Sequence, residues 1–341
     1  MKLFVYEHIT SGALVNQPLP DSLAQEGDIM LSAILDDCHA LAQCELIMLR
    51  DIRLPQVNII DGNSRHHCHP VSCPSDFQRL WVQCLAEADA VVIIAPETDN
   101  VLVQLQQQVL DANKIILGCQ PSAIALSTDK QVCDRELARH HIATPRSCIA
   151  RDWSKQQFDS ADGYILKPID GAGCLDTLVF DSITELEHYL AQQTANFLSQ
   201  TLIQSYITGI PASLSVLMSA DDSVVLAVNR QKIARQKNTL HFTGCVVNGL
   251  PQTVLSLSKA TELVQKIQQA IPGLWGFVGI DLVLTDKQAY VVDINPRLTT
   301  SYIGLQQSLA LNPMTLLFRM QEQGIATLPA IRQRQQIEIT L

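Results

Sequence analysis

Aromatic residues and charges are both scarce in this chain of 341 residues. Aromatics make up 5% and charged residues 17% of the sequence, whereas hydrophobic residues reach 47%. Nucleic-acid surfaces need clustered cations and, for single strands, aromatic side chains that stack on bases. The chain instead has 24 Lys and Arg against 34 Asp and Glu, a net charge of −10. The composition argues against a nucleic-acid partner and predicts a globular protein with a substantial core.

Long apolar runs are also missing. Runs such as residues 90–95 fall far short of the ~20 residues that a membrane helix needs, and Glu7 and His8 stand where a signal peptide would need its apolar stretch. We therefore expect a cytoplasmic protein without a membrane span. The apolar, weakly charged composition favours self-association, with a homodimer as a candidate, and leaves the oligomeric state open.

The ten cysteines contain no CxxC pair, so we expect reduced thiols rather than disulfides. Soft metal ligands gather in residues 66–73, which read HHCHPVSC. This stretch is expected to be a polar loop, and no second ligand pair stands at zinc spacing. We favour surface histidines here, and a zinc protein built on His66 to Cys73 is a competing hypothesis.

Two glycine-rich phosphate motifs are absent. No GxGxxG follows the first apolar segment, and no GxxxxGK[ST] occurs in the chain. These absences leave the dinucleotide fingerprint and the P-loop unsupported, so any nucleotide chemistry must use another architecture.

The first 118 residues alternate between short apolar segments and longer amphipathic ones. This alternation predicts an α/β domain whose parallel sheet is covered by helices on both faces. The expected strands are residues 2–6, 45–49, 90–95 and 114–118, and the expected helices are residues 22–41, 77–86 and 100–112.

The pattern changes after residue 118 and predicts an α+β part with antiparallel and mixed strands. Ser127, Thr128 and Asp129 form a capping run that opens a helix up to His140. Further helices are expected at 184–193 and 257–271, strands at 163–167, 177–180, 201–207, 213–218 and 224–230, and a hairpin over 276–294.

The expected hairpin carries a candidate metal site. Asp293 and Asn295 are two residues apart, so their side chains share one face of a strand, and Asp281 would face the same cavity from the neighbouring strand. Two carboxylates and an amide oxygen suit Mg²⁺. The alternative is a plain strand followed by an Asn-Pro turn. A buried Asp281 with no cation beside it is costly, so we favour the metal site.

A cation and a glycine-rich tip are further candidates for the same site. Arg297 follows Pro296, which ends the strand, and would be a fixed cation next to the metal. The glycines Gly171 and Gly173, at the tip of an expected hairpin, permit backbone conformations whose N–H groups bind phosphate, and Lys167 adds a positive charge. A glycine-rich tip alone is weak evidence for phosphate binding.

Four segments occur in the order and spacing of a known superfamily. They are Lys130 in TDK, Lys167 before the glycine loop, residues 204–209 (QSYITG), and Asp281 with residues 293–297 (DINPR). This ordered set resembles the ATP-grasp superfamily over about residues 119–320. The resemblance implies an ATP-grasp fold preceded by a Rossmann-like pre-ATP-grasp domain.

The resemblance also implies a division of the chain and roles for its residues. Residues 1–118 would be the pre-ATP-grasp domain, 119–203 the small lobe, 204–325 the large lobe with the metal site, and 326–341 a C-terminal arm. Lys130 and Lys167 would bind the phosphates of ATP, Gly171 and Gly173 would cover them, and Gln204, Ser205, Tyr206 and Ile207 would hold the adenine. Asp281, Asp293 and Asn295 would hold Mg²⁺ or Mn²⁺.

Softer matches point to one group within the superfamily. Residues 6–12 (YEHITSG), 23–27 (LAQEG), 50–55 (RDIRLP) and 296–302 (PRLTTSY) are similar to the tyramine–glutamate ligases of methanofuran-type cofactor synthesis. The similarity implies an ATP-dependent ligase that joins the γ-carboxylate of glutamate to a primary amine through an acyl phosphate.

The implied chemistry assigns the remaining candidates. Arg297, Lys167 and Arg230 would stabilise the charge that develops during phosphoryl transfer, although Arg230 also reads as a solvated strand end. Glu26 and Thr300 are candidate substrate contacts, with a surface helix residue and a helix cap as the alternatives. We expect Asp293→Ala to abolish ATP turnover and to leave the fold intact. A non-catalytic ATP-binding scaffold or sensor is the competing function.

Overall fold

A parallel sheet forms the amino-terminal part of the molecule. The computed structural model describes residues 1–41, 44–57, 66–155, 158–171 and 176–341. Its first five strands pair in the order β3-β2-β1-β4-β5, with parallel neighbours throughout. Their bounds are β1 (Lys2–Glu7), β2 (Glu45–Asp51), β3 (His66–Val71), β4 (Ala90–Ile94) and β5 (Ile115–Ile116).

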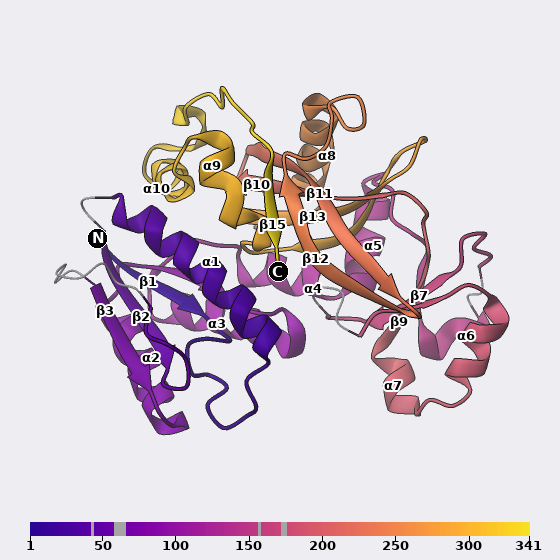
Figure 1. Ribbon diagram of the computed structural model, residues 1–341, viewed down its shortest axis with the longest axis horizontal. Helices are drawn as coiled ribbons and strands as arrows, with labels where there is room; N and C mark the ends of the chain where they lie inside the picture. Colours follow the sequence, from indigo (N-terminus) through magenta and orange to yellow (C-terminus); the bar gives the residue numbers. More distant parts are fainter. Residues whose placement is uncertain (42–43, 58–65, 156–157, 172–175) are drawn as a thin grey trace.

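Helices cover both faces of this sheet because its strands are apolar on both sides. Leu3 and Val5 of β1 belong to the core under α1, whereas Phe4 and Tyr6 belong to the core under α2 and α3. These helices are α1 (Asp21–His39), α2 (Pro74–Glu87) and α3 (Val101–Asp111), and they flank the sheet in Figure 1. The predicted α/β arrangement is confirmed.

The edge strand β3 corrects one prediction. The sequence predicts a loop over residues 66–73, whereas His66–Val71 pair with β2 along their whole length. The polar composition of this strand fits an edge position, where part of the backbone and side chains face solvent. In the described ranges, no three His, Cys, Asp or Glu side chains lie close enough together to hold a metal.

A second, mostly antiparallel sheet contains the rest of the strands, in the order β14-β13-β10-β11-β12-β8-β7-β9-β6. Among the described residues, the register between β12 and β8 is short: Thr239 pairs with Leu178, with backbone hydrogen bonds from Val179 to Asn238 and from Leu240 to Thr177 on either side. The bounds are β6 (Ser147–Ile149), β7 (Tyr164–Pro168), β8 (Leu178–Phe180), β9 (Thr201–Ser205), β10 (Ile210–Met218), β11 (Ser223–Gln236), β12 (Thr239–Val247), β13 (Gly276–Leu284), β14 (Ala289–Asn295) and β15 (Ile337–Thr340).

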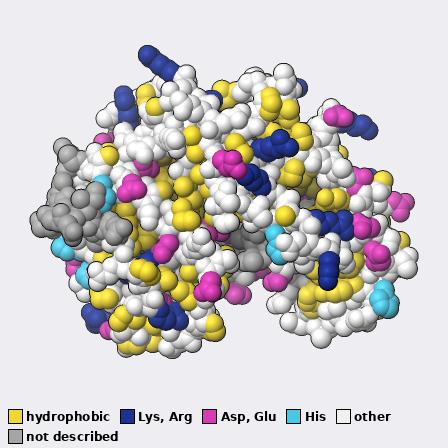
Figure 2. All heavy atoms as spheres, viewed as in Figure 1, with side chains coloured by type: hydrophobic (Ala, Val, Ile, Leu, Met, Phe, Trp, Pro, Cys, Tyr) yellow, Lys and Arg dark blue, Asp and Glu magenta, His cyan; other side chains and the backbone are white. Residues whose placement is uncertain are grey.

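Each half of this sheet has its own helices. The β6–β9 half packs on α6 (Ile183–Leu190), α7 (Ala195–Ser199) and the 3₁₀ turn η2 (Ala150–Lys155), and the β10–β14 half packs on α8 (Leu257–Ala270). The remaining helical segments are α4 (Pro121–Thr128), α5 (Lys130–Arg139), α9 (Leu305–Leu309), α10 (Pro313–Gln323), η1 (Thr98–Asn100), η3 (Thr300–Gly304) and η4 (Ile325–Thr327). Figure 2 shows a notch between the β1–β5 part and the β6–β9 half at the lower edge of this face.

The capping run near residue 129 separates two helices. The sequence predicts one helix up to His140, whereas α4 precedes the cap and α5 follows it. The Asp129 carboxylate accepts hydrogen bonds from the backbone N–H groups of Gln131 and Val132, as an N-cap does. This cap places Lys130 at the first turn of α5, close to the hairpin β13–β14.

The C-terminal arm adds a strand to the second sheet. β15 pairs with β12, and Gly244 is the register partner of Thr340. A Cβ on Gly244 would lie 2.1 Å from the carbonyl oxygen of Ile339, and the φ of Gly244 is +125°, so both space and conformation require glycine there. None of the helices that the structure describes is long and apolar enough to cross a membrane.

Candidate functional site

The carboxylates singled out in the sequence meet on two neighbouring strands. Asp281 of β13 pairs with Asp293 of β14, and Gly279 pairs with Asn295. Residues that pair, and residues two apart, share one face of a sheet. The Asn295 amide donates a hydrogen bond to Asp281 Oδ2 at 3.1 Å. The predicted hairpin and the predicted grouping of these three side chains are confirmed, and their role as metal ligands stays a prediction.

Two lysines reach the same hairpin from different elements. Lys130 Nζ of α5 donates to both oxygens of Asp293, at 2.7 and 2.8 Å. Lys167 Nζ of β7 donates to the carbonyl oxygen of Val292 at 3.2 Å. Lys130 is buried; burial alone would lower its pKa, but the Asp293 carboxylate outweighs that effect and raises the pKa. Both lysines are therefore fixed cations beside the carboxylates.

The surroundings of the Asp281 carboxylate are ones that a nearby cation would stabilise. Burial, together with the charge of Asp293, raises the pKa of Asp281 to about 6, against the opposing hydrogen bonds from Asn295 and Gln231. A divalent cation would offset both causes. Carboxylate and amide oxygens are the ligands that Mg²⁺ prefers, so Asp281, Asp293 and Asn295 fit this ion.

Gln231 is a site residue that sequence reasoning missed. Its Nε2 donates to Asp281 Oδ1 at 2.7 Å. The register places Ser213 opposite both Asn229 and Asp281, so Gln231, two residues beyond Asn229, lies on the Asp281 face. Arg230 lies on the opposite face and is exposed. The structure therefore does not bring Arg230 into this group, and it corrects that expectation because neighbouring strand residues alternate in direction.

Arg297 binds a carboxylate that the sequence did not suggest. Its Nε and Nη2 donate to the two oxygens of Glu97, at 2.9 and 3.2 Å. Glu97 follows β4 in the parallel sheet, and the two side chains are only 6% and 15% exposed for Glu97 and Arg297. Burial alone would lower the pKa of Arg297, but Glu97 outweighs it and raises that pKa. A charged residue after the carboxyl end of an apolar strand is the signal that could have found Glu97.

Glu26 and Thr300 come together although 274 residues separate them. The Thr300 hydroxyl donates to a carboxylate oxygen of Glu26 on α1. Thr300 is buried and begins η3, whose N-cap is Thr299 rather than Thr300. The helix-cap alternative for Thr300 is therefore wrong, and the two candidate substrate contacts form one pair between the two sheets.

Comparison with known families identifies this arrangement. Residues 127–301 match the ATP-grasp domain, and residues 44–124 match the pre ATP-grasp 3 domain. The first match covers more than half of the chain. The chain belongs to the ATP-grasp family. The predicted fold, an ATP-grasp fold with a preceding parallel-sheet domain, is confirmed.

Curated relatives and solved structures extend this result. The chain is 28% identical over 218 residues to the tyramine–L-glutamate ligase of Methanocaldococcus fervens, covering 64% of this chain and 62% of the relative. It is 26% identical over 223 residues to the enzyme of the same name from Methanocaldococcus jannaschii, covering 65% and 60%. The chain thus spans about three fifths of the length of the curated relatives it matches.

Solved structures share the fold over most of the chain. An ATP-grasp superfamily protein from Archaeoglobus fulgidus has a TM-score of 0.71 and 22% identity, covering 98% of this chain and 91% of that one. An L-amino acid ligase from Bacillus licheniformis has a TM-score of 0.64 and 13% identity, covering 94% and 73%. At these identities the two structures establish the fold alone.

In this ATP-grasp chain, the segment expected to hold adenine lies at the end of β9. The backbone N–H of Ser205 donates to the carbonyl oxygen of Arg146 at 2.8 Å, and that of Tyr206 donates to the carbonyl oxygen of Gly163 at 2.9 Å. These two N–H groups therefore already have hydrogen-bond acceptors within the protein. Gln204 shares a sheet face with Ser147 and Ile165, its partners in the register. Within the described residues its buried Nε2 has no hydrogen-bond partner, an unsatisfied group that a bound nucleotide would explain.

The glycine loop is only partly visible in the described chain. A Cβ atom added to Gly171 would lie 3.1 Å from Cβ of Pro168. Gly173 lies outside the described residues. Asp170, just before Gly171, accepts a hydrogen bond from the N–H of Asp99 at 3.0 Å, so the base of the loop contacts the parallel-sheet domain.

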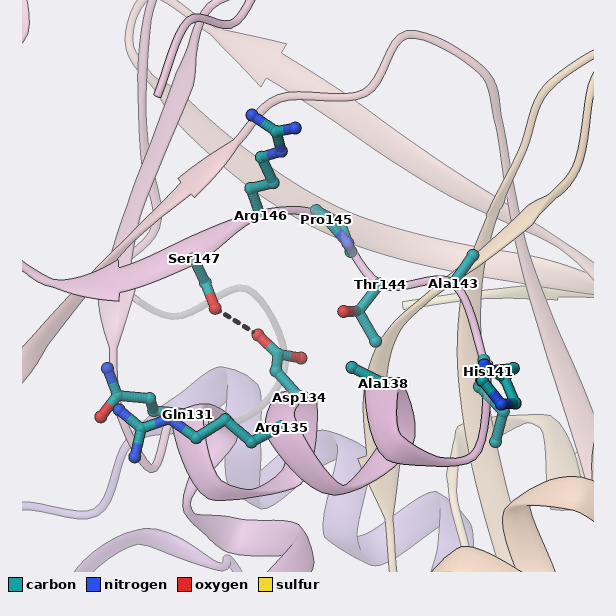
Figure 3. Close-up of a pocket in the computed structure, with 11 residues that line it drawn as sticks. Gln131, Asp134, Arg135, Ala138, His141, Ala143, Thr144, Pro145, Arg146 and Ser147 are labelled. Atoms are coloured by element: carbon teal, nitrogen blue, oxygen red, sulfur yellow. Dashed lines mark hydrogen bonds between the residues drawn. The ribbon is translucent and has the colours of Figure 1, made fainter. Parts of the chain in front are cut away.

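A pocket adjoins this site between α5 and residues 141–147. It has a volume of about 470 Å³. Figure 3 shows Ser147 bonded to Asp134 at its centre, with Gln131 and Arg135 toward one end and His141 toward the other. Burial raises the pKa of Asp134 to about 6, against the hydrogen bond from Ser147 and the charge of Lys167. Asp134 thus lies within the electrostatic reach of the ATP-grasp lysines.

The raised pKa of Asp134 predicts a pH-dependent stability. The folded chain binds the proton more tightly than the unfolded chain, so this group lowers the free energy of unfolding as pH rises from about 4 to about 6. Asp134→Asn removes the titration and keeps an acceptor for Ser147. The free energy of unfolding of the variant minus that of wild type should therefore increase between pH 4 and pH 7, by at most about 3 kcal/mol.

Urea unfolding of both proteins at several pH values measures this difference. Asp221→Asn, in an exposed turn, is the matched control and should give no pH-dependent difference. A constant difference between Asp134→Asn and wild type over this range would contradict the prediction.

Proposed function

We propose that this chain is an ATP-dependent carboxylate–amine ligase that forms ADP. The observation that carries the proposal is the meeting of Lys130, Lys167, Asp281, Asp293 and Asn295 at one hairpin. A bound triphosphate is stabilised by fixed cations together with a metal ion, and both can be provided here. The match to the ATP-grasp family supports ATP as the nucleotide. The tyramine–L-glutamate ligases among its relatives support glutamate and tyramine, or a similar primary amine, as the substrates. Within glutamate, the γ-carboxylate is the group that we propose to react.

The reaction would proceed in two balanced steps. A carboxylate oxygen of the first substrate attacks the γ-phosphorus of ATP, the bond to the β-phosphate oxygen breaks, and ADP leaves. The neutral amine then attacks the acyl carbon, the bond to the phosphate oxygen breaks, and the amine proton leaves with inorganic phosphate. The product is an amide, as in methanofuran-type cofactor synthesis.

The chain's own residues have distinct tasks in this scheme. Lys130 and Lys167 bind phosphate oxygens and oppose the charge that accumulates on the transferred group. Arg297 binds the carboxylate substrate or the tetrahedral oxyanion derived from it. Mg²⁺, when held by Asp281, Asp293 and Asn295, supplies charge neutralisation and orientation of the phosphates; Mn²⁺ prefers the same oxygen ligands.

A screen for ADP release tests the proposal. Purified chain with Mg²⁺ and ATP is given glutamate, an amine, both or neither, with tyramine, tyrosine and other primary amines as candidates. We expect ADP to form only with both substrates and the product mass to equal their sum less one water. With aspartate and other amino acids tested in place of glutamate, ADP formation with one of these and none with glutamate would overturn the glutamate assignment. ATP binding without ADP formation under all conditions would favour the scaffold or sensor.

Two other expectations accompany this function. A cytoplasmic location suits an enzyme that uses ATP and Mg²⁺, and it stays a prediction, as does the homodimer. Size-exclusion chromatography with light scattering measures the oligomeric state directly.

A further inference from the structure

The pocket between α5 and residues 141–147 is separate from the candidate nucleotide and metal residues. Its volume of about 470 Å³ falls within the range of small-molecule sites, about 300–1,000 Å³. It is lined by Gln131, Asp134, Arg135, Ala138 and residues 141–147. None of these is a candidate ligand of ATP or of Mg²⁺ in this chain. The proposed reaction therefore leaves this pocket without a role.

The pocket exists because small side chains face each other across it. Gln131, Arg135 and Ala138 are spaced by four and three residues, so they share one face of α5. The opposite wall contains residues 143–145, which read ATP. Figure 3 shows Ala138 and Thr144 opposite each other. A larger side chain at position 138 would enter the pocket.

The wall opposite α5 is held at both of its ends. The backbone N–H of Val291 in β14 donates to the carbonyl oxygen of Ala143 at 2.9 Å, and the N–H of Ser205 in β9 donates to that of Arg146 at 2.8 Å. The segment thus contacts both halves of the second sheet. Hydrogen-bonded walls make the pocket preformed, as small-molecule sites usually are.

The charges that line the pocket are mostly positive. Arg135 and Arg146 contribute two positive charges and Asp134 one negative charge, which leaves +1 with His141 neutral, in a chain whose net charge is −10. The Asp134 carboxylate already accepts a hydrogen bond from Ser147. Within the described chain, neither guanidinium has a hydrogen bond or an ion pair with another residue. Both guanidinium groups are therefore available to an anion.

Polar and apolar groups occupy different parts of the pocket. The side chains of Gln131 and Arg135 lie next to each other at one end in Figure 3, away from Ala138. A guanidinium and an amide N–H are donors that bind carboxylate and phosphate oxygens. The wall beyond them includes the aliphatic side chains of Ala138, Ile142 and Ala143. The matching ligand has an anionic group at one end and an apolar body at the other.

We propose that this pocket is a second ligand site, which binds a small molecule that carries a carboxylate or phosphate group on an apolar body. Arg135 and Gln131 bind the anionic group, and the exposed Arg146 adds a positive charge at the rim. The wall around Ala138 contacts the apolar body. The site goes beyond the proposed ligase function, because its ligand leaves the candidate ATP and Mg²⁺ residues free.

Calorimetric titration of the full chain with defined probes tests the proposal. Phenyl phosphate and phenylacetate present the two anionic groups on the same ring, and benzylamine presents a positive charge instead. We expect at least one anionic probe to bind wild type and benzylamine not to bind. The tighter of the two anions identifies the group that the site recognises. A wild type that binds neither anion, or that binds benzylamine as tightly, would overturn the proposal.

Variants of α5 locate the bound probe. Arg135→Gln removes a charge-assisted hydrogen bond and should weaken binding by at least about tenfold. Arg139→Gln is the matched control, since Arg139 lies one turn further along the same helix and pairs with Glu136; it should leave the affinity unchanged. Ala138→Leu keeps every charge and is a strong helix former, but it fills the pocket and should also weaken binding. Full affinity in Ala138→Leu would show that surface charge alone holds the probe and would overturn the proposal.

Lys167→Gln separates this pocket from the predicted phosphate site, where phenyl phosphate can also bind. The variant should bind phenyl phosphate as tightly as wild type does, because Lys167 does not line the pocket. A loss of affinity as large as that of Arg135→Gln would place the probe at the phosphate site and overturn the proposal. Circular dichroism of each variant shows that it is folded.

Discussion

Replacing Asp293 by asparagine is expected to reduce ADP formation by roughly a thousandfold or more. The single change removes a negative charge that serves both the proposed metal site and the ion pair with Lys130. Asp293 pairs with Asp281 across the strands and accepts two hydrogen bonds from Lys130. Asparagine has the same shape but provides one neutral oxygen. It therefore weakens the proposed metal site and also releases Lys130 from its fixed position.

The measurement is ADP release at saturating Mg²⁺ with both substrates, after circular dichroism has shown that the variant is folded. Asp286→Asn is the matched control, since Asp286 is exposed in the turn of the same hairpin. It should retain wild-type activity. An Asp293→Asn protein that forms ADP at the wild-type rate would refute the assignment of Asp293 to the metal site.

The hairpin could be predicted because its information is local. Alternation within residues 276–294 determines which side chains share a face, and the short turn brings the two strands into register. The observed register confirms that Asp281 and Asp293 are neighbours. Alternation along the strand predicts that Arg230 and Gln231 point in opposite directions. Only the strand's partners decide which of the two faces Asp281, and these partners are distant in the sequence.

The direct contacts that no local pattern predicts join distant segments, although the resemblance to the ATP-grasp superfamily already places Lys130 and Asp293 in one site. Glu97 and Arg297 are 200 residues apart and Lys130 and Asp293 are 163 apart. No periodicity in the sequence encodes such pairs, because they depend on how the parallel sheet docks against the antiparallel one. The polar strand β3 was missed for a related reason: its place at the sheet edge removes the apolar pattern by which buried strands are recognised.

The burial of the Lys130–Asp293 pair predicts a stability effect that the sequence alone did not. The sequence predicts that Asp293→Ala leaves the fold intact, but Lys130 and Asp293 side chains are only 8% and 19% exposed. Removing one partner leaves a buried charge without its counterion, which costs about 3–5 kcal/mol. We therefore expect Asp293→Ala to lower the free energy of unfolding by about this amount, measured by urea unfolding at pH 7.

The double variant Lys130→Met with Asp293→Ala separates this cause from a loss of packing. Methionine removes the buried charge and keeps most of the lysine's length, so the double variant should be more stable than Asp293→Ala alone. Asp181→Ala is the control for an exposed pair: Asp181 binds Arg235 through two hydrogen bonds at the surface, and its loss should destabilise the chain far less than Asp293→Ala does, because solvent screens the pair. A double variant as unstable as Asp293→Ala would show that packing around Asp293, rather than the unpaired charge of Lys130, determines the effect.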